Sequence, residues 1–295
     1  MKKETQPVKD ILNEAIDELQ AVQERTDGLS GVPSGYTGID RVTYGWQASD
    51  LIIIAARPAM GKTAFVLTMA RNMAVEHKVP VAVFSLEMSS VQLVKRLMVS
   101  ETGLSAEKIR GGKKLEPYEW EQLNNRINQL SEAPLYIDDT PSLSIYEFRS
   151  KARRLVSNAG VKLIVIDYLQ LMQGSKKSSN EGRQQEVSEI SRSLKALARE
   201  LNVPIIALSQ LSRGVESRQV KRPMLSDLRD SGSIEQDADM VCLLYREDYY
   251  NPETENQNVT ELIVAKNRNG PIDTVNLYFQ KQFTKFVGLE RKQLI

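Results

Sequence analysis

The sequence predicts an α/β fold: a mostly parallel, twisted β-sheet flanked by helices, with antiparallel strands at one edge and a separate helix at the N-terminus. Short, nearly continuous apolar runs alternate along the chain with helical patterns. Such runs are typical of strands buried on both faces, and helical crossovers between them indicate parallel neighbours. The expected parallel strands are residues 51–56, 81–86, 135–138, 162–167, 204–209 and 240–245.

Two further patterns complete the expected sheet. Apolar residues at helical spacing predict the clearest crossover helix, which contains Val187, Ile190, Leu194, Leu197 and Leu201. Three later segments alternate more strictly between apolar and polar residues, and turns such as "NRNGP" join them. We therefore expect antiparallel edge strands at residues 261–266, 274–279 and 283–288.

The N-terminal segment has its own pattern. Apolar residues at helical spacing from Val8 to Val22 predict one amphipathic helix, which either folds back on its own domain or docks on a neighbouring subunit. Residues 26–38 are rich in Gly, Pro and Ser and are expected to form a linker or capture loop without regular structure. We divide the chain into a linker helix with its connecting loop, residues 1–34, and one large domain, residues 35–295.

The composition of the 295 residues excludes several classes of protein. Lys plus Arg number 39 against 38 Asp plus Glu, so contacts to nucleic acid must come from local basic loops. One cysteine, Cys242, and one histidine, His77, leave no disulfide framework, zinc cage or His-based catalytic triad. The sequence lacks an apolar stretch of about 20 residues and a signal peptide, so we expect a cytoplasmic protein.

Residues 51–65, "LIIIAARPAMGKTAF", predict a phosphate-binding loop between a strand and a helix. The spacing matches G-x-x-x-x-G-K-[ST] except that Ala56 replaces the first glycine. That glycine permits an unusual turn where the strand ends, and alanine is the smallest side chain that can replace it. The alternative is a helix N-terminus with a surface lysine. The residues expected to bind nucleotide are Ala59, Met60, Gly61, Lys62, Thr63 and Ala64, with Thr63 also holding Mg²⁺.

Three polar residues lie at the carboxyl ends of other expected strands: Asp167 is the last residue of its strand, and Glu87 and Gln210 directly follow theirs. Asp167 suits the support of Mg²⁺, Glu87 the orientation or deprotonation of an attacking water, and Gln210 the sensing of a γ-phosphate. Taken singly, each is equally compatible with a turn or a solvated helix start. Because the carboxyl ends of parallel strands meet at one edge, we expect these residues to share a site with Lys62.

Together these motifs make the chain resemble the ATPase domain of bacterial replicative DNA helicases, the DnaB family, which has a RecA-like core. The resemblance extends over residues 33–272, and the family itself uses an alanine before Arg-Pro. The stretches that carry it are "ARPAMGKTAF", "FSLEM", "LIVIDYLQLM", "SQLSR", "SDLRDSGSIEQDAD" and "AKNRNGP".

The resemblance assigns a role to each matching residue. It implies that Glu87 is the general base, that Gln210 couples nucleotide state to DNA loops, and that Lys62, Thr63 and Asp167 hold ATP and Mg²⁺. It implies that Arg268 is an arginine finger reaching the next subunit's site, with Lys266 beside it. The residues expected to face single-stranded DNA are Arg229, Asp230, Ser231 and Gly232.

The resemblance also implies a homo-hexameric ring that moves 5′ to 3′ and unwinds DNA at a replication fork, with the N-terminal helix on the adjacent subunit. A helicase loader is a further candidate partner. The family's N-terminal collar, which meets primase, precedes the segment where this sequence begins, so a primase contact is in doubt. Two alternatives stay open: a RecA-type recombinase or repair ATPase, and a non-motor ATP switch. Further clusters that could follow DNA phosphates are residues 151–154, 175–180 and 218–222.

Overall fold

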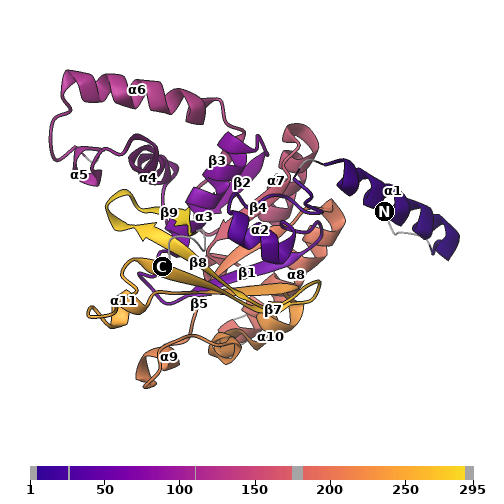
Figure 1. The fold of residues 1–295 in the computed structure, drawn as a ribbon. Coiled ribbons are helices and arrows are strands. Elements are labelled where there is room, and N and C mark those ends of the chain that lie inside the picture. The colour runs from indigo at the N-terminus through magenta and orange to yellow at the C-terminus, as the bar shows by residue number, and fades with distance from the viewer. Residues whose placement is uncertain (1–4, 26, 110, 175–181, 290–295) are drawn as a thin grey trace.

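A computed structural model describes residues 5–25, 27–109, 111–174 and 182–289, apart from the side chains at positions 14, 183 and 229–232. Its centre is one nine-stranded sheet with the strand order β3-β2-β4-β5-β1-β6-β7-β8-β9 (Figure 1). The strands are β1 Leu51–Ala56, β2 Val81–Ser85, β3 Leu135–Asp138, β4 Leu163–Asp167, β5 Ile205–Gln210, β6 Met240–Tyr245, β7 Val259–Asn267, β8 Thr274–Gln280 and β9 Lys285–Gly288.

The helices connect these strands and cover the sheet. None of those in the described ranges is long and apolar enough to cross a membrane. The α-helices are α1 Val8–Glu24, α2 Thr37–Thr43, α3 Lys62–Arg71, α4 Ser90–Thr102, α5 Ala106–Ile109, α6 Pro117–Ser131, α7 Ile145–Ala159, α8 Arg183–Leu201, α9 Gly214–Ser217, α10 Gly232–Asp237 and α11 Glu247–Tyr250. The 3₁₀ segment η3 spans Leu225–Ser231, immediately before α10.

The predicted division of the sheet is confirmed. Strands β1 to β6 pair in parallel, and β7, β8 and β9 add antiparallel strands beyond β6. The strand boundaries agree within one residue for the parallel part, whereas residues 281–283 form a 3₁₀ turn before β9. The expectation of burial on both faces is wrong for β3, which is partly exposed because it lies at the edge of the sheet.

Two apolar cores fill the two faces of the sheet. Alternate residues of β1 point to opposite faces, so Ile52 and Ile54 join one core and Leu51 and Ile53 the other. Helices α2, α3 and α4 supply the first core, while α7, α8 and α10 supply the second. This double covering explains why the central strands are continuous apolar runs.

Residues 31–36 lack a helix or strand, as predicted, apart from one isolated bridge at Val32, but they pack onto the domain and do not form a free linker. Val32 and Trp46 exchange backbone hydrogen bonds of 2.8 and 2.7 Å. A Cβ on Gly31 would lie 2.6 Å from the Trp46 carbonyl oxygen, so only glycine allows this approach. Tyr36 is buried and stacks on Phe65 of α3, with 5.7 Å between the ring centroids. This segment therefore belongs to the core despite its turn-like composition.

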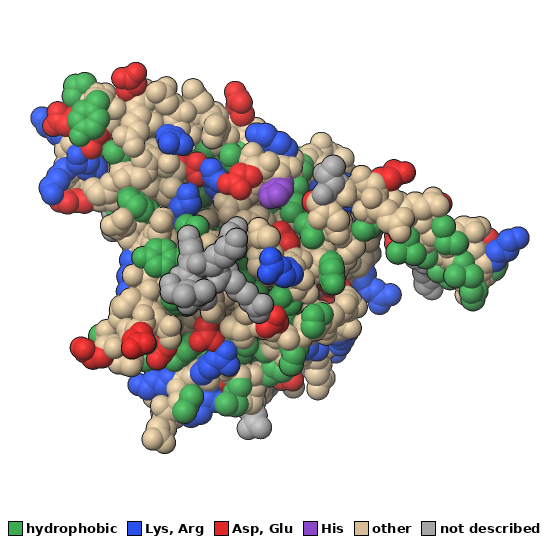
Figure 2. All heavy atoms as spheres, viewed as in Figure 1, with side chains coloured by type: hydrophobic (Ala, Val, Ile, Leu, Met, Phe, Trp, Pro, Cys, Tyr) green, Lys and Arg blue, Asp and Glu red, His purple; other side chains and the backbone are tan. Residues whose placement is uncertain are grey.

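Helix α1 forms as predicted, but it does not fold back on the domain. It projects from the body of the molecule (Figure 1), and its apolar stripe lies open to solvent (Figure 2). The side chains of the stripe are 48–70% exposed: Val8, Ile11, Leu12, Ile16 and Leu19. An apolar helix face of this size is stable only when something covers it, so this chain alone leaves the helix without its packing partner.

Candidate nucleotide-binding site

The loop between β1 and α3 has the geometry of a phosphate cradle. Gly61 is the N-cap of α3 with φ 96°, and Ala59 also has a positive φ of 64°. Ala56 stays in β1, paired with Gln210. The expectation that the unusual turn falls at Ala56 is therefore wrong: that position is still extended strand, which alanine adopts freely, and the left-handed backbone lies further along. Free N–H groups and the helix dipole make the start of α3 attractive to an anion.

Lys62 extends from this loop to the end of β5. Its Nζ donates to the carbonyl oxygen of Ser209 (3.2 Å) and lies 5.3 Å from the centre of the Tyr168 ring. Burial lowers the pKa of Lys62, while the charges of Asp167 and Glu87 oppose that shift. A partly buried ammonium whose hydrogen bond goes to a neutral carbonyl has a strong preference for an incoming anion.

Thr63 and Asp167 supply adjacent oxygens at the same edge. The Thr63 hydroxyl donates to Asp167 Oδ2 at 2.6 Å, joining the first turn of α3 to the end of β4. Burial raises the pKa of Asp167, and the Thr63 hydrogen bond and Lys62 oppose the shift. Mg²⁺ prefers oxygen ligands and is commonly held by one or two protein oxygens together with substrate phosphates and water. This pair fits that donor set, and within the described ranges no cluster of three or more His, Cys, Asp or Glu residues forms a separate metal cage.

A cavity of about 490 Å³ opens beside these groups. Lys62, Thr63, Glu87 and Gln210 all line it, so the structure brings together the polar residues predicted from separate strand ends. Asp167 stands behind Thr63. Met60 differs from the expectation, because its side chain is buried in the core and its N–H donates to the Arg57 carbonyl oxygen (3.4 Å). Its side chain therefore cannot contact a nucleotide.

Sequence reasoning missed several residues of this cavity. Arg96 comes from α4, Tyr168 follows β4, and Phe279 and Thr284 come from the antiparallel edge. The only signal at these positions was a cation on a helix or an aromatic in a strand, both of which are ordinary structural residues. Nothing in their spacing connects them with the phosphate loop.

Arg57 was also missed, and it fixes the loop from behind. Its side chain is 7% exposed, and it donates to the Leu211 carbonyl oxygen (2.7 Å) and to Glu216 (2.9 Å). Leu211 directly follows Gln210. The arginine therefore joins the start of the phosphate loop to the segment that carries the expected γ-phosphate sensor.

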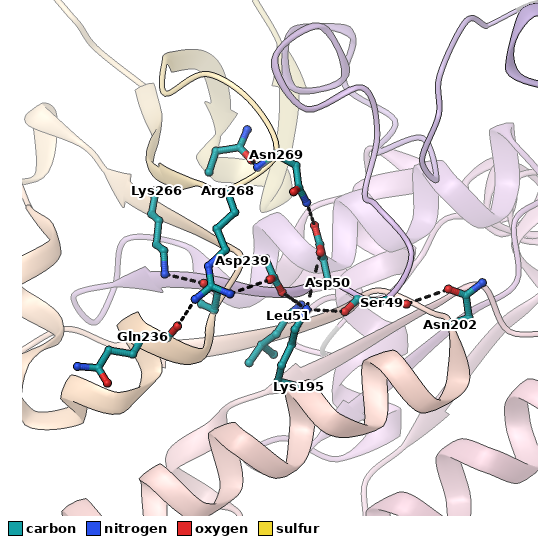
Figure 3. Close-up of polar contacts among 12 residues, drawn as sticks. Ser49, Asp50, Leu51, Lys195, Asn202, Gln236, Asp239, Lys266, Arg268 and Asn269 are labelled. Atoms are coloured by element: carbon teal, nitrogen blue, oxygen red, sulfur yellow. Dashed lines mark hydrogen bonds and ion pairs between the residues drawn. The ribbon is translucent and has the colours of Figure 1, made fainter. Parts of the chain in front are cut away.

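Arg268 and Lys266 lie at the opposite edge of the sheet, near the amino ends of the parallel strands (Figure 3). Strand β7 runs antiparallel to β6, and Asn267 pairs with Met240, the first residue of β6. The length of β1 alone puts roughly 17 Å between the two edges, at about 3.3 Å per residue. The two side chains therefore do not reach the phosphate loop of their own chain.

The residues expected to bind DNA are placed only in part. Arg229, Asp230 and Ser231 lie in η3, and Gly232 begins α10, but their side chains lie outside the described part of the chain, as does all of 175–180. Two other basic clusters are engaged within the chain. Lys151 pairs with Asp138 at 2.6 Å, and Arg218 pairs with Asp227 at 2.7 Å. Those two ion pairs favour a structural role for these cations.

Comparisons with known proteins identify the family of the chain. The DnaB-like helicase C-terminal domain family matches residues 31–288. The replicative DNA helicase DnaB of Geobacillus stearothermophilus is 57% identical, and the replicative DNA helicase DnaC of Bacillus subtilis strain 168 is 54% identical; each match covers 97% of this chain. The chain spans 62% and 63% of the length of these two relatives.

Solved structures give the same result. One solved ATPase domain superimposes with a TM-score of 0.90 and 43% identity, covering 97% of this chain and 100% of that domain. A DnaB-like replicative helicase, studied with its primase interactions, gives a TM-score of 0.86 at 43% identity and covers 98% of this chain and 68% of that one. The fold is thus the RecA-like ATPase core that the motifs implied, and this chain belongs to the DnaB-like helicase C-terminal domain family.

Proposed function

We propose that copies of this chain form a ring that hydrolyses ATP with Mg²⁺ between neighbouring subunits, moves 5′ to 3′ along single-stranded DNA and unwinds the duplex at a replication fork. One observation carries the proposal: the groups suited to hold a triphosphate and the cations suited to promote its cleavage lie at opposite edges of one sheet. Each copy can then complete the site of the next. Because a bacterial chromosome is replicated in the cytoplasm, the proposal also places the protein there.

At the carboxyl edge, this chain's residues bind and orient the nucleotide. The N–H groups at the start of α3 face the phosphates, and Lys62 exchanges its neutral carbonyl partner for phosphate oxygens. Thr63 and Asp167 would hold Mg²⁺, which neutralises developing charge on the phosphates when bound. Asp167 then serves as a fixed acceptor that keeps the Thr63 oxygen directed into the cavity.

Two residues at the mouth of the cavity are placed to act on the reacting water. Glu87 is exposed at the end of β2, where a carboxylate can orient a water or take its proton. Gln210 is exposed at the end of β5 and is followed by Leu211, which is tied to Arg57. We assign Glu87 the role of general base and Gln210 the role of γ-phosphate sensor.

The cations come from the neighbouring copy. Charge spreads over the phosphoryl oxygens in the transition state, and a guanidinium supplied in trans stabilises it. Arg268 is 49% exposed and follows the end of a strand, so its side chain can extend toward another subunit. Lys266 provides a second positive charge beside it.

Helix α1 has a matching surface on a second copy. A groove of about 590 Å³ between α4 and α6 is lined by apolar side chains that include Met98, Leu115 and Trp120. Three lysines also line it, and two of them pair with glutamates of the same chain. Trp120 is 53% exposed there. The stripe of α1 is apolar, and its flanks are acidic, with Asp10, Asp17 and Glu18. Covering that stripe stabilises a ring by an amount on the order of 5 kcal/mol for each contact.

The test of the function is ATP turnover and strand displacement on a forked DNA with a 5′ single-stranded tail. The wild-type chain is expected to hydrolyse Mg²⁺-ATP, faster with single-stranded DNA, and to release the displaced strand. Lys62→Ala should lose turnover and unwinding together, because the phosphates lose the cation of the phosphate loop. Turnover that survives in this variant would refute the site. Turnover without strand displacement would point to the ATP switch, and open filaments on DNA to the recombinase.

A further inference from the structure

Helix α10 connects two regions with different proposed roles. Its amino end follows η3, the segment proposed to hold DNA, and its carboxyl end leads through Ala238 and Asp239 into β6. The helix has six residues, which is too short to be stable by itself. Its position therefore depends on packing against α8, where Ile234 is buried, and on the contacts made at its two ends.

The contacts at the carboxyl end come from the two proposed finger residues. Lys266 Nζ donates to the carbonyl oxygens of Glu235 (2.6 Å) and Ala238 (2.7 Å). Arg268 Nη2 donates to the carbonyl oxygen of Gln236 at 2.6 Å. Figure 3 shows both side chains turned toward this end of the helix. The same cations that would serve the neighbour's nucleotide thus cap a helix of their own chain.

Such a cap is favourable but replaceable. The last carbonyls of a helix lack partners within the helix and carry partial negative charge, so cations stabilise them. Lys266 is partly buried, and burial together with the nearby Arg268 charge lowers the pKa of Lys266. A multiply charged anion attracts two neighbouring cations more strongly than neutral carbonyls do, because both partners of each contact are then ionised. Arg268 also lies 3.4 Å from Asp239 Oδ1, a contact that the anion would have to replace.

We propose that Lys266 and Arg268 alternate between two partners: the carbonyl oxygens at the end of α10 and the phosphates of a nucleotide bound by the neighbouring copy. When the adjacent copy holds ATP, its phosphates draw the two side chains away from α10. The carboxyl end of α10 then loses its cap, and the DNA segment that precedes α10 is released from its resting position. The inference rests on the proposed function, because it assumes that the finger residues act in trans, and it adds a route from the neighbour's nucleotide to this chain's DNA segment.

Asp239 is the fixed point that makes this exchange reversible. Its Oδ2 accepts from Leu51 N (2.9 Å) and pairs with Lys195 of α8, so it is attached to β1 and α8 (Figure 3). Its carbonyl oxygen accepts from Arg268 N at 2.9 Å, and its Oδ1 lies 3.4 Å from Arg268 Nη1. The end of β7 therefore stays in place while the side chains move, and Asp239 offers the guanidinium a position to return to.

Hydrogen exchange of the α10 amides, measured by mass spectrometry on the full chain, tests this exchange of partners. Without nucleotide, residues 233–238 should be partly protected in the wild type. Addition of a non-hydrolysable ATP analogue to assembled rings without DNA should raise their exchange roughly five-fold. Lys266→Met should show the faster exchange before nucleotide is added and no further response. Lys266→Arg, which keeps a cation at this position, should retain most of the protection and the response.

The affinity for a single-stranded oligonucleotide gives a second readout. The wild type should bind it with a different Kd in the presence of the analogue, whereas Lys266→Met should bind with the same Kd in both states. Equal exchange of residues 233–238 with and without analogue would overturn the inference, even if turnover requires Arg268 and the proposed function stands. Turnover that survives in Lys62→Ala would instead refute the proposed function and remove the basis of the inference.

Discussion

The two edges of the parallel sheet differ in what they hold. The carboxyl edge has an open cavity with a partly buried lysine, a hydroxyl and a carboxylate around a helix N-terminus. The amino edge has a closed polar network in which Asp239 pairs with Lys195 and Arg268. One edge is suited to receive an anion, and the other presents a cation. The difference shows that the molecule carries two complementary halves of a site that cannot meet within one chain.

The comparison also shows why each half is stable alone. At the carboxyl edge, Lys62 is satisfied by a neutral carbonyl, and the Asp167 carboxylate by the Thr63 hydroxyl. At the amino edge, Lys266 donates to helix carbonyls, and Arg268 contacts a helix carbonyl and, at 3.4 Å, the Asp239 carboxylate. Both cations have partners in this chain, and the carbonyls among these partners attract a cation less strongly than a phosphate oxygen does. We therefore expect these side chains to leave the partners in their own chain only when nucleotide is bound between two copies.

The largest expected effect is the recovery of ATP turnover when two inactive variants are mixed, and it tests whether the two edges act together. Lys62→Ala lacks the carboxyl half, and Arg268→Ala lacks the amino half, so each alone should lose roughly 10³-fold or more in turnover. In mixed rings, about one quarter of the interfaces combine an intact Lys62 with an intact Arg268, as expected for random head-to-tail contacts. Mixing should therefore restore a substantial fraction of the wild-type ATP turnover.

The control mixes either variant with the double variant, which carries no intact half and should restore nothing. Each single variant should still assemble, which analytical ultracentrifugation can establish before turnover is compared. If the mixture of single variants stays inactive while its rings form, the two edges do not cooperate in trans.

Asp167→Asn tests the carboxyl edge by itself. The amide oxygen can still accept from Thr63, but the charge that supports Mg²⁺ is gone, so turnover should fall about 10²- to 10³-fold. Stability should change in the opposite direction, because burial raises the pKa of Asp167 and its ionised form is unfavourable in the fold. We expect the Tm at pH 7.5 to rise by about 1–3 °C. A lower Tm with normal turnover would contradict both parts.

Helix α1 tests whether the two edges must be brought together by assembly. Ile16→Asp places a charge in the exposed apolar stripe and should weaken the contact with a neighbouring groove. At submicromolar protein, rings should dissociate, and turnover should fall about 10- to 100-fold and recover at higher protein concentration. Asn13→Asp adds the same charge to α1 outside the apolar stripe and serves as the control. Unchanged assembly of Ile16→Asp would exclude the stripe from the interface.

The sequence predicted the parallel part of the sheet because its central strands are buried on both faces and must therefore be continuous apolar runs. It also predicted that Lys62, Glu87 and Gln210 share an edge, since the direction of parallel strands determines where their ends lie. It did not predict that the loop at residues 31–36 packs onto the domain, where Gly31 allows a close contact with Trp46. It failed again at Ala56, because positive φ cannot be assigned from residue type when Ala59 adopts it.

The part of the site that the sequence did not predict comes from the antiparallel strands. Phe279 and Thr284 enter the cavity only because β8 and β9 fold over the phosphate loop, which is a tertiary contact without any local signal. The cap of Lys266 and Arg268 on α10 could not be predicted for the same reason. Their partners are backbone carbonyls, which every residue carries, so no side-chain pattern marks them.

The smallest expected effect is a change in stability on substitution of Asp50, which tests the electrostatics of the amino edge. Burial and the neighbouring Asp239 charge raise the pKa of Asp50 to about 6, against an ordinary value of 3.8. Between pH 3.8 and about 6, Asp50 is therefore protonated in the folded protein and ionised in the unfolded chain. The wild type consequently gains stability as the pH falls through 6. Above pH 6 the ionised carboxyl is a cost. Asp50→Asn removes that cost and should stabilise the protein at pH 7.5 by an amount on the order of 1 kcal/mol.

The pH dependence separates this explanation from a general effect of amide substitution. The advantage of Asp50→Asn, measured by urea unfolding, should be largest above pH 6 and should disappear as pH falls toward 4, because the wild-type carboxyl is then neutral as well. Asn269 Nδ2, which donates to Asp50 Oδ2 at 3.2 Å, keeps an acceptor in the variant. An advantage that is constant from pH 4.5 to 8 would mean that the two carboxylates do not repel each other. The Lys195 ammonium, 3.9 Å from Asp50 Oδ1, would then suffice to neutralise both.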